Sequence, residues 1–355
     1  MAQRVLIDRQ NIKAAQLQGY TPGTLAPGMT RLRLQSFALT TNNITYAATG
    51  DILKYWQFFP SDIAGQGIVP VWGVAQVVES KAPDLPPGTQ VYGFFPMAET
   101  LDIAAKAIAP GVFQDMAPHR QGLALVYNSY TVVTGKDTHA SDLRSLLQPL
   151  LATSYLLCDW LADNAWFGAV QMIIGSASSK TGLGLCKYLA EIPDRPFQII
   201  GLTSAGHAEF VSRAAGCDSV ITYDALQQIA QKPSVYIDMA GNAAVKSALH
   251  QHLGDQLQHS AAVGTSHWDK FAPLADLPGP KPQFFFAPAQ IAKRRAEWGA
   301  GVIEGEITRA WKRLAAEAAT WLEVVEHTGL GQSVPLWQRL AAGQVPPNEG
   351  HIIRA

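Results

Sequence analysis

A run of small and hydroxyl-bearing residues that follows an apolar segment has the clearest chemical potential in this sequence. Residues 170–185 read VQMIIGSASSKTGLGL, which predicts an apolar strand, a tight turn and the start of a helix. Backbone N–H groups at such a turn can bind a pyrophosphate at the positive end of the helix dipole. The strict GxGxxG spacing is absent, and Gly/Ser turns at helix starts are often only caps. The candidates for a nucleotide site in this turn are Ser176, Ser178, Ser179, Lys180, Thr181 and Gly182.

The end of the next expected strand indicates which dinucleotide would fit. Sites for NAD usually place Asp or Glu there to hold the ribose 2′-hydroxyl. This sequence reads GLTSAGH over 201–207, with no carboxylate before Glu209. Thr203, Ser204 and His207 could hydrogen-bond a 2′-phosphate, and Lys180 could reach it from the first turn. We therefore predict NADP(H) as the cofactor, while noting that a polar, uncharged strand end is common.

Strands and helices alternate around this turn. Helical spacing of apolar residues over 141–164 is followed by buried-type strands and helices in turn. Such alternation predicts right-handed crossovers and an α/β unit with a doubly wound parallel sheet, the Rossmann arrangement. The expected strands are 170–175, 197–202, 219–222, 235–239 and 258–263, with 284–286 as a candidate sixth, and the expected helices are 182–191, 208–215 and 243–253.

The first 130 residues or so predict a different, β-rich unit. Residues 30–39 alternate between two faces, 69–78 form a second β-type run, and a Pro/Gly turn precedes 91–95. Short strands between such turns are typical of a small barrel. A long helix near 304–327 and a last strand at 351–354 follow the Rossmann unit, and the barrel offers a sheet for that strand to join. We therefore assign 1–135 with 330–355 to a barrel domain and 136–329 to a nucleotide-binding domain.

Composition and charge argue against several classes of function. The chain has 355 residues, a formal net charge of −1 and a pI near 6.8. This near-neutral charge does not indicate binding to nucleic acid or to an anionic membrane. No run of about eighteen apolar residues is present, and the N-terminus lacks the layout of a signal peptide. Three scattered cysteines, Cys158, Cys186 and Cys217, fit a reducing compartment. We expect a cytoplasmic protein with a small-molecule substrate, and we expect the basic run 293–295 on a solvated face.

Several short motifs occur in an order that resembles a known superfamily. They are WGVAQVVE at 72–79, GTQVYGF at 88–94, AGCDSVITYD at 215–224 and VYIDMAG at 235–241. With the Ser-rich turn and a strand ending at Gly264, they resemble the medium-chain dehydrogenase/reductase superfamily over nearly the whole chain. The likeness is closest to its zinc-free quinone oxidoreductase and enoyl reductase branch, and to a bacterial subfamily described as a domain of unknown function.

This resemblance implies a GroES-like barrel domain, a Rossmann domain and a cofactor at the carboxyl edge of the parallel sheet. The matched motifs place Tyr223, Ala240 and Gly264 against the cofactor, and Thr265 follows at the same edge.

The residues that zinc-dependent members of this superfamily need are missing. Those members use a barrel cysteine, a Gly-His-Glu unit and a later Cys or Asp as ligands. Here Trp72, Gly73 and Val74 stand where His and Glu would be, and no cysteine precedes Cys158. We therefore predict no metal, and expect hydrogen-bond donors or a proton source to assist the hydride acceptor instead.

The segment TTNNITY at 40–46 is the candidate catalytic segment. Zinc-free members carry an Asn-bearing segment at this position, facing the nicotinamide. By this resemblance Tyr46 would donate the proton and Asn43 would hold a substrate oxygen or the cofactor. The alternative is that Asn42 and Asn43 form a turn and that Tyr46 packs with its hydroxyl bonded. A following cluster either lines a substrate cleft or belongs to the core: Lys54, Tyr55, Trp56, Phe58 and Phe59.

These observations together predict an NADPH-dependent reductase of an activated C=C, quinone or carbonyl group. A reductase for thioester or polyketide-like intermediates is a second enzymatic interpretation. A cofactor-binding sensor or structural protein of the same fold is the non-enzymatic alternative, because fold does not fix function. We also expect a homodimer, since residues 284–286, three phenylalanines near an edge strand, would be costly to leave in water.

Overall fold

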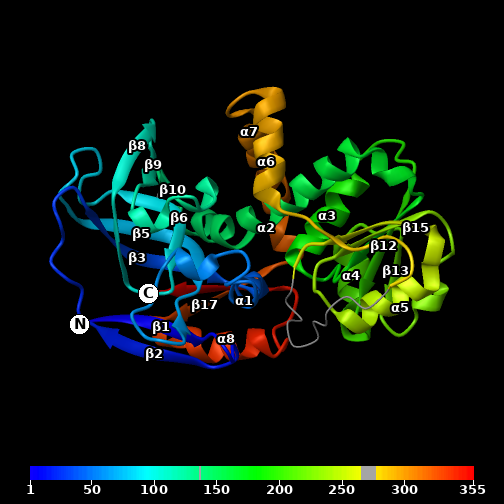
Figure 1. Cartoon of the computed structure of the whole chain (residues 1–355), viewed down its shortest axis with the longest axis horizontal. Helices are drawn as coiled ribbons and strands as arrows, with labels where there is room; N and C mark the ends of the chain where they lie inside the picture. Colours follow the sequence, from blue (N-terminus) through cyan, green and yellow to red (C-terminus); the bar gives the residue numbers. More distant parts are fainter. Residues whose placement is uncertain (136, 265–276) are drawn as a thin grey trace. The chain divides into compact units, whose positions relative to one another are not determined.

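The computed structural model describes residues 1–135, 137–264 and 277–355, which form two compact units (Figure 1). One comprises Met1–Leu146 and Glu323–Ala355, and we call it the barrel unit. The other comprises Leu147–Leu322, and we call it the Rossmann unit. The sequence suggests divisions near residues 135 and 329, whereas the structure divides the chain at 146 and 322.

Most of the barrel unit is one sheet of nine described strands. In spatial order they are β17 (Glu323–Thr328), β18 (Glu349–Arg354), β3 (Thr30–Leu39), β5 (Pro70–Ser80), β6 (Gln90–Pro96), β10 (Ser129–Val132), β9 (Val112–Asp115) and β8 (Ala105–Ala109), with β7 (Thr100–Ile103) paired to β3. A smaller sheet joins β2 (Ala15–Tyr20), β1 (Ala2–Asp8) and β4 (Gln66–Gly67). The last strand, β18, runs antiparallel to β3, so the end of the chain joins the barrel sheet as predicted.

The pairing of β3 with β5 positions the aromatic residues discussed below. Along β3, Leu32 and Leu34 are buried while Arg33 between them is exposed, which is the predicted alternation. A Cβ atom at Gly73 of β5 would lie 2.2 Å from the carbonyl oxygen of Ser36. Only glycine permits this approach, and it fixes the neighbouring Trp72 at the strand pair.

The segment before the last strand differs from the sequence-based expectation. Helix α7 (Val302–Ala316) ends at Ala316, so the predicted helix over 304–327 is wrong in its second half. A 3-10 turn at Ala318–Thr320 interrupts it, and β17 follows. This strand pairs in parallel with β18, and the β-branched Val324 and Val325 suit it. Tertiary pairing therefore overrides the helical spacing in this segment.

The Rossmann unit is built on a parallel sheet of six described strands, which confirms the predicted fold class. In spatial order the strands are β13 (Ser219–Thr222), β12 (Gln198–Thr203), β11 (Gln171–Gly175), β14 (Ser234–Asp238), β15 (Leu257–Ala262) and β16 (Gln283–Phe284). Helices α3 (Lys180–Ala190), α4 (Ala208–Ala214) and α5 (Ala243–Leu253) follow β11, β12 and β14. The strand order reverses between β11 and β14, the point at which doubly wound sheets bind ligands.

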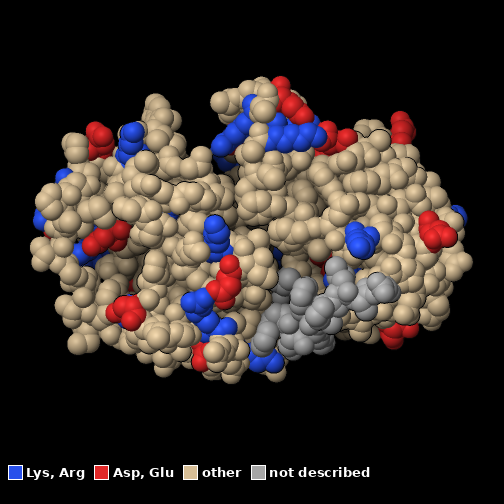
Figure 2. Space-filling model, viewed as in Figure 1, with Lys and Arg blue, Asp and Glu red and all other residues tan. Residues whose placement is uncertain are grey.

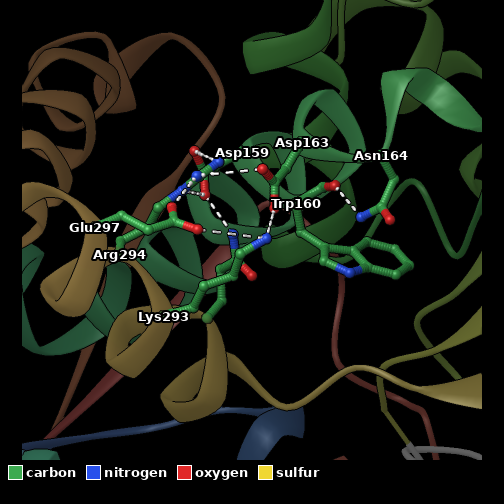
Figure 3. A network of polar contacts seen from close by, with 8 residues as sticks. Asp159, Trp160, Asp163, Asn164, Lys293, Arg294 and Glu297 are labelled. Carbon is green, nitrogen blue, oxygen red and sulfur yellow. Dashed lines mark hydrogen bonds and ion pairs between the residues drawn. The ribbon is translucent and has the colours of Figure 1, made fainter.

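A network of ion pairs joins helix α2 (Thr138–Asp163) to α6 (Ala287–Trp298), as Figure 3 shows. Arg294 donates from Nε and Nη2 to the two carboxylate oxygens of Asp159 over 2.8 and 2.9 Å. Its Nη1 lies 3.2 Å from Asp163 and 2.6 Å from Glu297, and Lys293 also pairs with Asp163. Arg294 is only 8% exposed, so the predicted solvated face is wrong for this residue. The two α2 carboxylates, one turn apart, draw the guanidinium into the helix contact.

The surface shows no large region of one charge on the face drawn in Figure 2, where basic and acidic side chains are interspersed. Among the described residues, none of the helices combines the length and apolar character needed to cross a bilayer.

Candidate functional site

The turn after β11 is built by serine side chains. Ser179 is the N-cap of α3, and its hydroxyl oxygen accepts the N–H of Gly182 at 3.1 Å while its O–H donates to the carbonyl of Ser176 at 2.8 Å. Ser176 has a positive φ of 51°, a conformation that costs energy for any residue with a Cβ atom. Both hydroxyl bonds close the turn between strand and helix. The helix cap therefore lies within the turn that the sequence suggests for the nucleotide.

Two glycines let α3 pack closely on its neighbours. A Cβ atom at Gly182 would lie 2.5 Å from the carbonyl oxygen of Ser176, and one at Gly184 would lie 2.8 Å from Oγ of Ser154 in α2. In the dinucleotide fingerprint, glycines serve the turn, the approach to the pyrophosphate and the close packing of helix on strand. Here Gly182 permits the close approach of α3 to the turn and Gly184 that of α3 to α2, without the GxGxxG spacing.

Tyr223 connects the turn to the neighbouring strands. Its hydroxyl oxygen accepts the backbone N–H of Ser176 at 3.1 Å, and its own backbone N–H donates to the carbonyl of Thr203 at 3.0 Å. The N–H of Ala177 donates to the carbonyl of Leu202 at 2.9 Å. Burial raises the pKa of Tyr223 to about 12, so its phenol is neutral at physiological pH.

The residues proposed for the 2′-phosphate differ in exposure. Ser204 and His207 are half-buried at the end of β12 and the following turn, and burial lowers the pKa of His207. Thr203 is fully buried, and among the described residues its hydroxyl has no hydrogen-bond partner. Lys180 and Thr181 begin α3 and are both half-buried. The structure therefore gathers this set at one edge of the sheet, with Thr203 beneath the surface.

A buried carboxylate shapes the adjacent loop after β14. Asp238 is 2% exposed, and its Oδ1 accepts the N–H groups of Ala240 at 3.1 Å and Gly241 at 2.8 Å. Lys246 of α5 places Nζ 3.5 Å from Oδ2. The N–H of Gly264 donates to the carbonyl of Asp238 at 3.4 Å, which puts Ala240 and Gly264 at the ends of neighbouring strands. No local motif singles out Lys246 in the sequence, and Thr265 lies outside the described residues.

In the barrel unit, Asn43 holds the start of helix α1 (Thr41–Ala48). Its Oδ1 accepts the backbone N–H of Thr40 at 2.7 Å, and its Nδ2 donates to the carbonyl of Pro70 at 2.9 Å. Asn43 is 3% exposed. Both ends of the amide are thus engaged within the chain, and the residue ties α1 to β5.

Tyr46 lies one turn further along α1 and is 5% exposed. Its hydroxyl oxygen accepts the Nε1–H of Trp72 at 3.2 Å, and its ring centroid lies 4.5 Å from that of Tyr55 and 5.5 Å from that of Phe94. Burial raises the pKa of Tyr46 well above its usual value. The side chain is therefore a neutral phenol at physiological pH.

Tyr46 belongs to a group of packed rings that we call the aromatic cluster. Its members are Tyr46, Tyr55, Phe58, Trp72, Tyr92, Phe94 and Tyr127. Trp72 and Tyr127 are the half-buried members, and the others are buried. Aromatic rings therefore occupy this part of the barrel unit. Among the described residues, no three His, Cys, Asp or Glu side chains are grouped to hold a metal.

The sequence found only part of this cluster. Tyr55 and Phe58 were candidates from their local run, but Trp56 packs elsewhere, between the backbones of Gly50 and Gly67. Tyr92 and Tyr127 come from β6 and from the turn Leu125–Tyr127, and no local signal links them to α1.

The family model described as Protein of unknown function (DUF2855) matches residues 37–346 of the chain. The chain belongs to this family. That membership agrees with the resemblance to a subfamily described as a domain of unknown function. No curated protein sequence gives a significant match to this DUF2855 protein.

Solved structures show the same fold as this DUF2855 protein. CurA from Vibrio vulnificus in complex with NADPH has a TM-score of 0.65 at 14% identity, covering 100% of this chain and 99% of that one. A mutant enoyl thioester reductase from Candida tropicalis has a TM-score of 0.58 at 12% identity, with 100% and 99% covered. A quinone oxidoreductase from Pseudomonas syringae pv. Tomato gives 0.59 at 13% identity, with 99% and 100% covered. The fold is therefore that of the medium-chain dehydrogenase/reductases, as the motif order predicts.

Proposed function

We propose that this DUF2855 protein is an NADP(H)-dependent, zinc-independent reductase of an activated C=C, quinone or carbonyl group. The observation that carries the proposal is the serine-built turn at the carboxyl end of β11, next to the strand-order reversal and without a carboxylate at the end of β12. Structures of this fold have been solved with NADPH or NADP bound, among them CurA and the yhdH oxidoreductase from Salmonella enterica.

The residues at this edge fit such a dinucleotide. A Cβ atom at position 182 would clash with the turn, so glycine is needed there for α3 to start close to the turn. That start would place α3 beside a bound pyrophosphate. Ser178, Lys180 and Thr181 would hold the pyrophosphate, and Ser204 and His207 would meet the 2′-phosphate. Ala240 and Gly264 would border the nicotinamide end. NADPH, when bound, supplies the hydride.

The aromatic cluster supports the choice of a conjugated acceptor. Trp72 and Tyr127, its half-buried members, offer ring faces 6.0 Å apart between centroids, and planar π-systems pack well on such faces. We assign the proton to Oη of Tyr46, which remains a neutral donor because of its burial. Asn43 would act by holding α1, since its amide is already bonded to Thr40 and Pro70.

One observation favours a second candidate function, a nucleotide-binding protein without turnover. Both candidate catalytic side chains, Tyr46 and Asn43, are almost completely buried and bonded inside the barrel unit. A protein that kept the cofactor turn but used this region only as core would look the same in these two positions.

Oxidation of NADPH with a panel of quinones, enones, aldehydes and enoyl thioesters tests the proposal. Turnover of quinones or enones, unaffected by a zinc chelator and without stoichiometric zinc in the purified protein, is the expected result. Tight NADPH binding with no turnover on any acceptor would favour the second candidate. Turnover of enoyl thioesters alone would assign the protein to thioester intermediates.

We further propose that the protein is a homodimer. Phe284 and Phe286 near the edge strand β16 are 51% and 37% exposed, and their stacked rings form an apolar surface. Light scattering at micromolar concentration should give twice the chain mass, and a monomer would reject this part of the proposal.

A further inference from the structure

We propose that Tyr223 is a positioning residue for the nucleotide turn, holding Ser176 in its left-handed conformation through the hydrogen bond that its phenol oxygen accepts from the Ser176 N–H. This inference rests on the proposed nucleotide-binding function. In a regular dinucleotide-binding turn a glycine makes the tight turn possible. Here a side chain just after β13 would stabilise the turn instead.

The backbone of Ser176 is the first reason. Its φ of 51° lies in the left-handed region, which glycine adopts freely and a residue with a Cβ atom adopts only at a cost. Such conformations persist only where the surroundings enforce them. Something in the structure must therefore hold Ser176 in place.

The hydrogen bonds around Ser176 show what holds it. Its N–H donates to Oη of Tyr223 at 3.1 Å, and its carbonyl accepts the O–H of Ser179 at 2.8 Å. The Tyr223 bond thus fixes the N–H side of the residue, and two bonds from Ser179, from its O–H and from its backbone N–H at 2.9 Å, fix the carbonyl side. The Ser179 bonds are local to the turn, whereas the Tyr223 bond comes from beyond the end of another strand and ties the turn to the sheet.

Tyr223 is itself firmly anchored. Its backbone N–H donates to the carbonyl of Thr203 at 3.0 Å, and its ring packs on the core cluster that includes Leu202 and Ile221. The phenol oxygen is therefore a fixed acceptor rather than a mobile one. Ser178, Lys180 and Thr181, the residues proposed to hold the pyrophosphate, lie two to five residues after Ser176 in the same turn and the start of α3, so we expect their placement to depend on this bond.

The test is a set of single and double variants read by calorimetric titration with NADPH and NADH. Tyr223→Phe removes only the hydroxyl, and we expect both nucleotides to bind roughly fivefold more weakly, an effect the size of about one hydrogen bond. Ser176→Gly in the Tyr223→Phe background should restore affinity to within about twofold of the wild type, because glycine adopts the positive φ without help.

Tyr188→Phe is the matched control. Tyr188 is a buried tyrosine in α3, the helix that the turn opens, and its hydroxyl has no hydrogen-bond partner among the described residues. Removing that hydroxyl should leave nucleotide affinity unchanged, which separates the effect of the Ser176 bond from any general effect of losing a phenol.

The outcomes separate the possible roles of Tyr223. A loss of NADPH affinity alone in Tyr223→Phe, without rescue by Ser176→Gly, would make Tyr223 a direct ligand of the 2′-phosphate and overturn the proposal. Unchanged affinity for both nucleotides would also overturn it. If the wild type binds neither nucleotide, the proposed function fails. Thermal unfolding then decides the positioning role: Tyr223→Phe should lower the melting temperature and Ser176→Gly should recover it, and no recovery rejects the role.

Discussion

The indole N–H of Trp72 donates to the phenol oxygen of Tyr46 over 3.2 Å, so a residue of β5 and a residue of α1 share one polar contact inside the aromatic cluster. The phenol oxygen accepts this bond, so the bond does not use the phenol proton. The Trp72 ring also packs on Tyr92 and Phe94.

Substitution of Tyr46 by Phe separates proton donation from packing. We expect kcat/KM with the best acceptor to fall about a hundredfold, because loss of a general acid typically has this size. The free energy of unfolding should fall by about 1 kcal/mol, since the N–H of half-buried Trp72 loses its partner. Steady-state rates and urea unfolding measure the two effects.

Tyr92→Phe is the control for this prediction. The Tyr92 hydroxyl donates over a long 3.5 Å to the carbonyl of Arg144, so the rate should stay within about twofold of the wild type. An undiminished rate in Tyr46→Phe, together with lowered stability, would return Tyr46 to the packing role that the sequence left open.

Substitution of Trp72 by Leu should change acceptor preference. The ring of Trp72 is half-buried and packs 5.0 Å from Phe94 and 6.0 Å from Tyr127 between centroids. Aromatic stacking contributes about 0.5–1.5 kcal/mol beyond area burial, so KM for flat quinones should rise roughly two- to tenfold. KM for small aliphatic enones should change less. Equal effects on both classes would mean that the ring does not contact the acceptor.

The Rossmann sheet could be predicted from the sequence because its strands are short apolar runs between helical segments. Residues 171–175 and 198–203 are almost entirely buried, and such strands carry their signal locally. The start of α3 was predicted to within two residues, because the sequence suggests a helix from Gly182 whereas the N-cap Ser179 begins it at Lys180.

The aromatic cluster could not be predicted in the same way. Tyr46, Trp72 and Tyr127 are separated by long stretches of chain and meet only through the pairing of β3, β5 and β6. For Asn43 a local signal is present in the sequence. Thr40 and Asn43 are spaced as in a capping box, in which the side chain at the third helical position accepts the backbone N–H of the N-cap residue. Asparagine takes the place of the usual glutamate or glutamine here.

His259 predicts a pH dependence of stability. It is 5% exposed, stacks on Phe167 at a centroid distance of 4.1 Å, and its burial lowers the pKa of the imidazole. The unfolded chain, with a histidine pKa of about 6.5, therefore binds more protons than the folded one below that pH. This contribution to stability is complete above about pH 6.5 and is lost as the pH falls towards the folded pKa.

The variant His259→Phe keeps a ring on Phe167 and removes the titration. We expect its melting temperature to depend less on pH than that of the wild type between about pH 7.5 and 5.5. The control is His139→Gln, a change at an exposed position of α2, which should leave the wild-type pH dependence in place. A steeper acid loss in His259→Phe than in the wild type would contradict the assignment.

The last prediction concerns the choice between NADPH and NADH. Lys180 begins α3 beside Ser179, and the end of β12 offers Ser204 and His207 without a carboxylate. A 2′-phosphate at this edge would meet donors rather than repulsion. A hydrogen bond to a charged group contributes about 1.5–3 kcal/mol, which corresponds to roughly a tenfold to hundredfold preference for NADPH.

Substitution of Lys180 by Ala tests which phosphate the lysine contacts. If it contacts the 2′-phosphate, NADPH should weaken by at least about tenfold while NADH changes little. If it contacts the pyrophosphate, both nucleotides should weaken equally, because they share that group. Lys187→Ala is the matched control, since this lysine lies in the same helix with Nζ 3.6 Å from Glu317 and should affect neither nucleotide. A wild type that binds NADH more tightly than NADPH would refute the assignment of cofactor from the end of β12.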